Sequence, residues 1–418
     1  MRPFFRPRCV ASLALAAVAG TIFAVPANAE TIKIAFIDPL SGPFAPVGQN
    51  QLKTFQLMAE QANKGKWAGE HQFEVVGFDN KVSPQESLTQ LKAVIDQGYR
   101  FILQGNGSGV GLALLDAVNK HNERNPGKEV LYLNYAAIDP DMTNSKCSFW
   151  HFRFDANSDM KMEALTTYMA KDKKIKNVYI IGQNYAFGQS VSKSAKEYLA
   201  RKRPDIKIVG DDLHPIGQVK DFSPYIAKIK ASGADTVITG NWGSDLSLLI
   251  RAAKDADLKA NFYTYYAVTT GVPTAMGAAG AERVKIIGNW LANNESNNGK
   301  ELVEAFKKKY NDDLYTAQGH SSIGMLSKAI KETKSLDPSK IAFALEGMKL
   351  ASLNGEVTMN RVDHQLQQPL YIGVWTKTNG KDVKYDQENT GYGWKVEQKI
   401  DAYIAAQPTT CQMKRPTR

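Results

Sequence analysis

Strand-like apolar runs and amphipathic segments alternate through the first two thirds of this 418-residue chain. Such alternation is typical of a mostly parallel sheet with helices on both faces. In a first series, the predicted strands are 33–37, 74–78, 100–103 and 130–133, and the helices are 49–63, 84–97 and 109–122. In a second series, the strands are 178–181, 207–209, 236–239 and 261–265, and the helices are 187–203, 223–231 and 244–256. The shared rhythm predicts two similar α/β lobes.

The last third has a shorter rhythm and is expected to complete both lobes. Its predicted elements are a strand at 284–288, helices at 300–310, 321–333 and 338–346, and strands at 356–359 and 370–376. We therefore assign 30–150 plus 268–350 to the first lobe, 151–267 plus 351–400 to the second, and 401–418 to a C-terminal tail. The chain would cross between the lobes near 150–154, 266–270 and 350–355. Such a three-segment hinge lets a cleft close on a ligand.

The first 29 residues have the three-part pattern of a secretion signal. Arg2, Arg6 and Arg8 precede an apolar run over 10–25, and Ala27-Asn28-Ala29 follows it. A membrane anchor is the alternative, but the run is shorter than the ~20 residues that a span requires. We expect cleavage after Ala29 and export to the periplasm.

The mature chain would keep 389 residues, enough for two domains. Loss of three arginines lowers the formal net charge from +10 to +7. Lysines are spread over the predicted helices, which indicates solvated faces and no nucleic-acid partner. We expect a monomer.

Two cysteines, Cys147 and Cys411, follow the signal segment. In a compartment that permits disulfides, they predict one bridge that fixes the tail. Two buried thiols are the alternative.

A glycine-rich loop, Gln104-Gly-Asn-Gly-Ser-Gly-Val-Gly111, follows a predicted strand and opens a helix. Backbone N–H groups at such a helix start can hold an anion. The spacing matches neither the dinucleotide fingerprint nor a phosphate loop, so no cofactor is predicted. The N–H groups of Gly107 to Gly109 and the Ser108 hydroxyl are candidates for holding a carboxylate. A tight structural turn is the alternative.

Hydrolytic chemistry has little support, because Ser108 lacks a Gly-x-Ser-x-Gly elbow. The six histidines form no pair at metal-ligand spacing, and only His320 stands at a predicted helix start. Aromatic residues follow several predicted strands, where they can line a cleft: Tyr135, Tyr185, Phe187, Trp242, Tyr265 and Tyr266. About half of them are expected to be core residues instead, and Trp242 is the strongest candidate for the cleft.

Three segments resemble the leucine/isoleucine/valine-binding protein family, the periplasmic receptors of branched-chain amino-acid type ABC importers. They are Ile34-Ala-Phe-Ile-Asp-Pro-Leu-Ser-Gly-Pro43, Asn134-Tyr-Ala-Ala-Ile-Asp-Pro-Asp-Met-Thr143 and Asp221-Phe-Ser-Pro-Tyr-Ile-Ala-Lys-Ile-Lys230. The resemblance covers nearly all the mature chain. It implies a two-lobed type I periplasmic-binding fold that encloses a ligand, with no catalytic residue and no metal.

The resemblance also implies where the ligand is held. In the first lobe, the positions are Gly107, Ser108 and Gly109 in the turn and Ala136, Ala137 and Ile138 in the next loop. In the second lobe, aromatic positions close over the ligand, and the loop at Tyr266 and Ala267 and the helix start at His320 face the cleft. The implied second-lobe aromatic residues are Phe187 and Trp242, which Tyr185 accompanies.

Two departures from the family concern the ammonium group of an amino acid. Ile138 stands where threonine is usual, and Ala267 stands at the position aligned with an acidic residue. A buried ammonium without a counter-charge costs several kcal/mol. The residues therefore predict a small carboxylate ligand with an aromatic or apolar body and no α-ammonium. Asp139 or Asp245 could supply the missing charge instead, in which case branched-chain or other amino acids would bind.

The expected function is capture of that ligand for an inner-membrane ABC permease. A ligand-reporting partner of a membrane sensor has the same fold and is an alternative. A secreted hydrolase using His320 or Ser108 is the least favoured.

Overall fold

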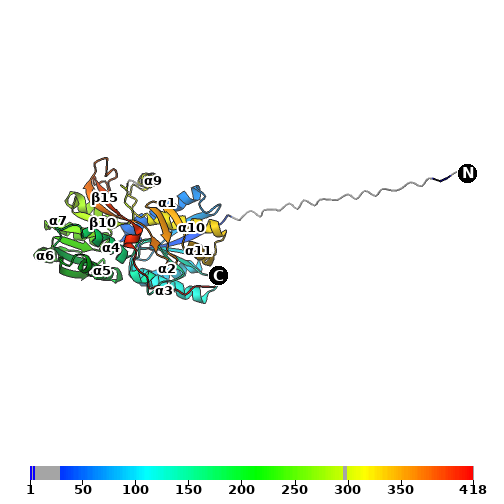
Figure 1. Cartoon of the computed structure of the whole chain (residues 1–418), viewed down its shortest axis with the longest axis horizontal. Coiled ribbons are helices and arrows are strands. Elements are labelled where there is room, and N and C mark those ends of the chain that lie inside the picture. Colours follow the sequence, from blue (N-terminus) through cyan, green and yellow to red (C-terminus); the bar gives the residue numbers. More distant parts are fainter. Residues whose placement is uncertain (2, 5–28, 295–298, 418) are drawn as a thin grey trace.

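A computed structural model of the chain describes residues 1, 3–4, 29–294 and 299–417. Apart from residues 1 and 3–4, these residues form two lobes, each built on its own main sheet (Figure 1). Residues 5–28, which hold most of the predicted signal segment, lie outside the described residues. Among the helices of the described residues, none is long and apolar enough to span a bilayer.

The first lobe is built on a five-stranded parallel sheet in the order β2-β1-β3-β4-β5. Its strands are β1 (Thr31–Asp38), β2 (Gln72–Asp79), β3 (Phe101–Gln104), β4 (Leu131–Asn134) and β5 (His151–Arg153). Every residue of β3 and β4 is buried, as expected for central parallel strands covered on both faces.

The helices of this sheet are α1 (Ala45–Lys64), α2 (Pro84–Asp96) and α3 (Ser108–Arg124), and a short 3-10 helix η1 (Pro140–Thr143) follows β4. Local chemistry fixes the start of α2, because the Ser83 hydroxyl accepts a hydrogen bond from the Glu86 N–H and Pro84 occupies the first turn. Ser-x-x-Glu and a first-turn proline are both helix-start signals.

The second lobe is built on a seven-stranded sheet in the order β15-β14-β10-β9-β8-β6-β7. Its strands are β6 (Asn177–Gln183), β7 (Lys207–His214), β8 (Thr236–Thr239), β9 (Asn261–Thr264), β10 (Val284–Gly288), β14 (Leu370–Lys377) and β15 (Tyr392–Ile400). Its helices are α4 (Ser158–Met169), α5 (Ala186–Lys202), α6 (Ser223–Ala231), α7 (Gly243–Asp255), α8 (Val272–Met276), the 3-10 helix η2 (Gly277–Gly280) and α12 (Ala402–Ala405). Strand β14 runs antiparallel to both neighbours.

The remaining elements pack on the first lobe. They are α9 (Lys300–Tyr310), α10 (Gln318–Thr333), α11 (Pro338–Leu345) and a small antiparallel sheet of β11 (Lys349–Ser352), β12 (Gly355–Met359) and β13 (Leu366–Gln367). Their apolar side chains join the core cluster that contains β1 and α1.

The boundaries expected from the sequence are wrong at two of the three crossings. Strand β10 pairs with β9 and β14, so 268–288 stay in the second lobe and do not begin the first. Strands β11 to β13 belong to the first-lobe core, so 351–366 are not part of the second lobe. The core memberships place the crossings at 154–156, 287–290 and 366–370.

Side-chain amides hold the three crossings together. Gln368 donates from Nε2 to the Phe154 carbonyl at 2.8 Å. Asn354 donates from Nδ2 to the Asn289 carbonyl and to Gln368 Oε1, each at 3.0 Å. These bonds lie in buried surroundings, so the hinge is a packed structural unit.

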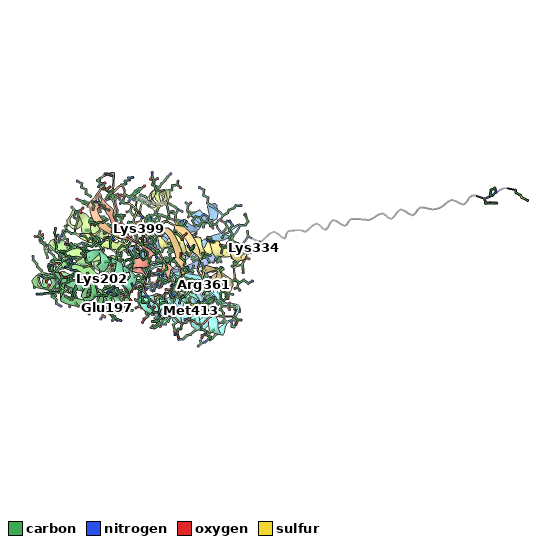
Figure 2. The ribbon with its side chains drawn as sticks, in the orientation of Figure 1. Glu197, Lys202, Lys334, Arg361, Lys399 and Met413 are labelled. Carbon is green, nitrogen blue, oxygen red and sulfur yellow. A yellow bond between two sulfur atoms is a disulfide. The ribbon has the colours of Figure 1, made fainter. Side chains whose placement is uncertain are left out.

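The C-terminal tail makes a further connection between the lobes. Its helix α12 packs on α4 of the second lobe, and Cys411 then forms a disulfide with Cys147 of the first lobe. This confirms the predicted bridge. In Figure 2, Met413 lies over the first lobe, whereas Lys202 at the end of α5 lies in the second.

Candidate ligand-binding site

A cavity lies between the lobes, at the carboxyl ends of strands from both sheets. We call it the main cavity. In open α/β sheets, ligands bind at this end of the strands. The first lobe lines it with Gln51, Gly105, Asn106, Gly107, Ser108, Ala136 and Ile138, and the second with Tyr185, Phe187, Trp242, Tyr266 and Thr269.

The first-lobe wall is the turn between β3 and α3. Gly107 has φ +89°, a conformation that side chains disfavour, and it lets Ser108 begin α3 directly after the turn. Ser108 Oγ accepts a hydrogen bond from the Asp139 N–H at 3.2 Å, which leaves its hydroxyl hydrogen free to donate. The start of α3 and this hydroxyl together form a cradle suited to a carboxylate.

The buried Asp38 carboxylate holds this turn in place. Its Oδ2 accepts the Gly105 N–H at 2.9 Å, and its Oδ1 accepts the Asn106 N–H at 2.8 Å. Burial raises the pKa of Asp38 to about 7, while the hydrogen bonds from Tyr135 and the two N–H groups oppose that rise. Asp38 therefore fixes the cradle without contacting the cavity.

We expect Asp38→Asn to loosen the turn. One carboxylate oxygen becomes an NH2 group that faces an N–H donor, and the unmade bonds should lower the free energy of unfolding by about 1–3 kcal/mol. Hydrogen exchange should speed up in the peptide 104–111. Asp79→Asn is the matched control, because Asp79 binds the N–H groups of Leu40 and Lys81 at the end of β2, away from the cavity. Unchanged exchange at 104–111 in Asp38→Asn would contradict this role.

The second-lobe wall is aromatic. Tyr185, Phe187, Trp242 and Tyr266 follow β6, β8 and β9, and Trp242 donates from Nε1 to the Tyr185 hydroxyl at 3.0 Å. The Phe187 ring packs edge-on against Tyr266, with their centroids 5.8 Å apart. This wall suits a flat or apolar ligand body.

Phe44 of the first lobe forms a contact between the lobes beside this wall. Its ring lies 4.2 Å from that of Trp242, centroid to centroid. A Cβ added to Gly217 or to Gly243 would come within 2.9 Å of the Phe44 ring, so both glycines are needed for this close approach. The Phe44 side chain therefore occupies a slot in the second lobe, and this contact can form only while the lobes are together.

Phe44→Ala should shift the lobes toward an open arrangement. Loss of the aromatic pair should destabilise the closed form by ~1.4 kcal/mol or more. This lowers the ratio of closed to open molecules by ~10-fold. Small-angle scattering should show a larger radius of gyration for the ligand-free variant. Phe78→Ala is the control, because Phe78 pairs with Tyr99 inside the first lobe. Equal radii for Phe44→Ala and wild type would contradict the proposed slot.

Tyr266, next to Ala267 in the sequence, forms part of the main-cavity wall, and none of the lining residues in the described part of the chain is acidic. Its hydroxyl lies 3.4 Å from the Ala136 carbonyl oxygen and 3.4 Å from Asp155 Oδ2. Asp155 Oδ2 also pairs with Lys161 Nζ at 2.9 Å, and both side chains are buried. The Lys161 ammonium lies over the Tyr266 ring, 4.6 Å from its centroid.

The main cavity brings together most of the residues singled out in the sequence. They are Gly107, Ser108, Ala136, Ile138, Tyr185, Phe187, Trp242 and Tyr266. Four others do not line it: Gly109, Ala137, Ala267 and His320. Ala137 and Ala267 are buried in lobe cores. His320 contacts Ser352 Oγ and the Trp67 ring, because α10 begins at Gln318 and position 320 lies on another side of the helix.

Sequence reasoning missed several residues of this site. Gln51, Asn106 and Thr269 line the main cavity, and Asp38 supports it. For Asp38 a signal was available, since a carboxylate at the end of a buried strand requires donors nearby.

Comparisons with known proteins agree with this architecture. Residues 31–381 match the family model described as periplasmic binding protein. The Leu/Ile/Val-binding protein homolog 4 of Brucella melitensis biotype 1 is 32% identical, with 97% of each chain covered. A leucine-, isoleucine-, valine-, threonine- and alanine-binding protein from Brucella ovis, solved in a closed conformation, superposes with a TM-score of 0.80 at 29% identity, covering 93% of this chain and 100% of that one.

A solute-binding protein of an ABC transporter from R. palustris, solved with 4-hydroxybenzoate, has the same fold. Its TM-score is 0.75 at 21% identity, covering 89% of this chain and 97% of that one. The predicted fold and the expectation of a solute receptor without catalytic activity are both confirmed. The chain belongs to the periplasmic binding protein family, as a substrate-binding protein of the ABC-transporter type.

Proposed function

We propose that the protein captures a small carboxylate with an aromatic or apolar body and no α-ammonium, and delivers it to an inner-membrane ABC permease. The signal segment would be cleaved after Ala29, and the mature receptor would act as a monomer in the periplasm. The Ser108 turn would hold the carboxylate, and Trp242 and Phe187 would cover the ligand body.

The observation that carries this proposal is the position of the Tyr266 hydroxyl. It lies against the Ala136 carbonyl, one of the acceptors that an ammonium group would need, at 3.4 Å. Asp155, the nearby carboxylate, is already paired with Lys161. An ammonium placed here would add a second positive charge beside Lys161, which is costly in a buried site.

A receptor for branched-chain amino acids is the second candidate. Relatives named for leucine, isoleucine and valine support it. The fold alone does not discriminate between amino acids and aromatic acids as ligands, since a structure of the same fold was solved with 4-hydroxybenzoate. The choice therefore depends on the residues around Tyr266.

A calorimetric titration of ligand-stripped protein tests the choice. We expect benzoate or hydroxycinnamate acids to bind and leucine, isoleucine and valine not to bind. Binding of the aliphatic amino acids alone would overturn the proposal.

Ser108→Ala tests the carboxylate cradle. Loss of one hydrogen bond to a charged oxygen should weaken binding of the acid by ~10–100-fold. Ser87→Ala is the control, because the buried Ser87 donates to the Ser83 carbonyl in the same lobe, away from the main cavity. Equal affinities in the two variants would show that the Ser108 hydroxyl does not bind the carboxylate.

A further inference from the structure

A second cavity adjoins the main cavity behind Tyr266. We call it the distal cavity. Gln51, Ala136, Tyr266 and Thr269 line both. Lys161 and Gln318 line the distal cavity only. The two cavities therefore adjoin across the four shared residues, and polar side chains lie beyond Tyr266 from a ligand held at Ser108.

The distal cavity contains an acceptor without a donor. Gln318 is 7% exposed, and its Oε1 has no hydrogen-bond partner within the part of the chain that the structure describes. Asp155, which pairs with Lys161 but does not line the distal cavity, likewise has a buried Oδ1 that is unpaired among those residues. A buried acceptor left unpaired costs about 1–3 kcal/mol, so a group that donates to it would be stabilised there.

The distal cavity also contains a donor. The Lys161 ammonium carries three N–H donors, of which Asp155 Oδ2 accepts one at 2.9 Å. Its charge is balanced by Asp155. A ligand group here can therefore accept from Lys161 and donate to Gln318, but it should be neutral, because either an ammonium or a second carboxylate would leave a buried charge uncompensated.

We propose that the distal cavity recognises a hydroxyl group on the far end of the ligand, so that the preferred ligands are hydroxylated acids. A hydroxyl is a small neutral group that both donates and accepts. Gln318 and the Lys161–Asp155 pair are then the specificity-determining residues. This inference rests on the proposed function, because it takes the carboxylate to be held at Ser108.

Paired titrations test the distal cavity. Benzoate and cinnamate are compared with their 3-hydroxy and 4-hydroxy forms. At least one hydroxylated acid should bind ~10–100-fold more tightly than its parent acid, the effect of a hydrogen bond that involves a charged group. Gln318→Met keeps the side-chain length, removes the neutral acceptor and should reduce this ratio by ~3–10-fold, with the parent acid little affected. Gln56→Met, on α1 and outside both cavities, should keep the wild-type ratio.

A ligand change gives a second measurement on wild-type protein, should Gln318→Met fail to fold. Methylation of the preferred hydroxyl removes the donor to Gln318 but keeps the acceptor for Lys161, so the methyl ether should bind ~3–10-fold more weakly than the hydroxylated acid. Equal binding of hydroxylated and parent acids would overturn the inference while leaving the proposed function intact. A wild-type ratio retained in Gln318→Met would also overturn it. Failure of all the acids, with binding of leucine, isoleucine or valine, would instead overturn the proposed function.

Discussion

Lys161→Met should lower the free energy of unfolding by about 3–5 kcal/mol. The Lys161 and Asp155 side chains are only 3% and 0% exposed, and their charged atoms lie 2.9 Å apart. Methionine fills the volume of the lysine but leaves the Asp155 carboxylate buried without its counter-charge. Breaking one side of such a pair is costly because the other charge was desolvated on folding. Denaturant titration of ligand-free protein measures the effect.

Two further variants separate charge from packing. Lys53→Met breaks the pair with Asp312, whose side chains are 35% and 21% exposed, and should cost at most ~1 kcal/mol. The double variant Lys161→Met/Asp155→Leu removes both buried charges and should recover most of the lost stability, since apolar replacement of a buried pair is often neutral. If Lys161→Met lowers the free energy of unfolding no more than Lys53→Met does, the Lys161–Asp155 pair does not behave as a desolvated ion pair.

Most of the fold was predictable because short stretches of the sequence determine where individual strands and helices begin and end. Fully buried strands such as β3 and β8 are short apolar runs, and the segments between them carry helix-start signals such as Ser83 and Pro84. The assignment of β10 was not predictable in this way. Its sequence Val-Lys-Ile-Ile-Gly suits either sheet, and its partner β14 lies far along the chain, with Ile286 opposite Gly373. Non-local pairing therefore decides the lobe boundary.

In the site, too, the residues with a local sequence signal were predictable, and those that depend on tertiary packing were not. Residues just after strand ends, such as Ser108 and Trp242, were predictable because carboxyl ends of parallel strands meet at one edge. His320 was selected from the sequence and not Gln318, which lies two positions earlier on the same helix. Two positions along a helix change the side that a residue faces. Lys161 lies between Met160 and Met162 in a helix that is mostly buried, a pattern that could have indicated a buried charge. Its pairing with Asp155 depends on tertiary packing.

Removal of the disulfide should be the second large effect. The Cys147–Cys411 bridge joins residues 264 positions apart, so it restricts a long loop of the unfolded chain. In the chain-entropy account, long loops give the larger stabilisation, and Cys147→Ser/Cys411→Ser should lower the free energy of unfolding by about 2–5 kcal/mol. Denaturant titration of the double variant and of the oxidised wild type measures it. A difference below ~0.5 kcal/mol would show that the bridge does not stabilise the fold.

The same variant should also change how far the lobes can separate. Ala405 is buried in the second-lobe core, and Cys411 is bonded to the first lobe, so the tail between them reaches at most about 20 Å when extended. Without the bridge, the remaining tail contacts include the hydrogen bond from Thr409 Oγ1 to the Thr143 carbonyl at 3.0 Å and the ion pair of Arg415 with Glu346. These contacts can break when the lobes part. Small-angle scattering should therefore give a larger radius of gyration for the ligand-free double variant than for wild type, and equal radii would mean that the three crossings alone limit the opening.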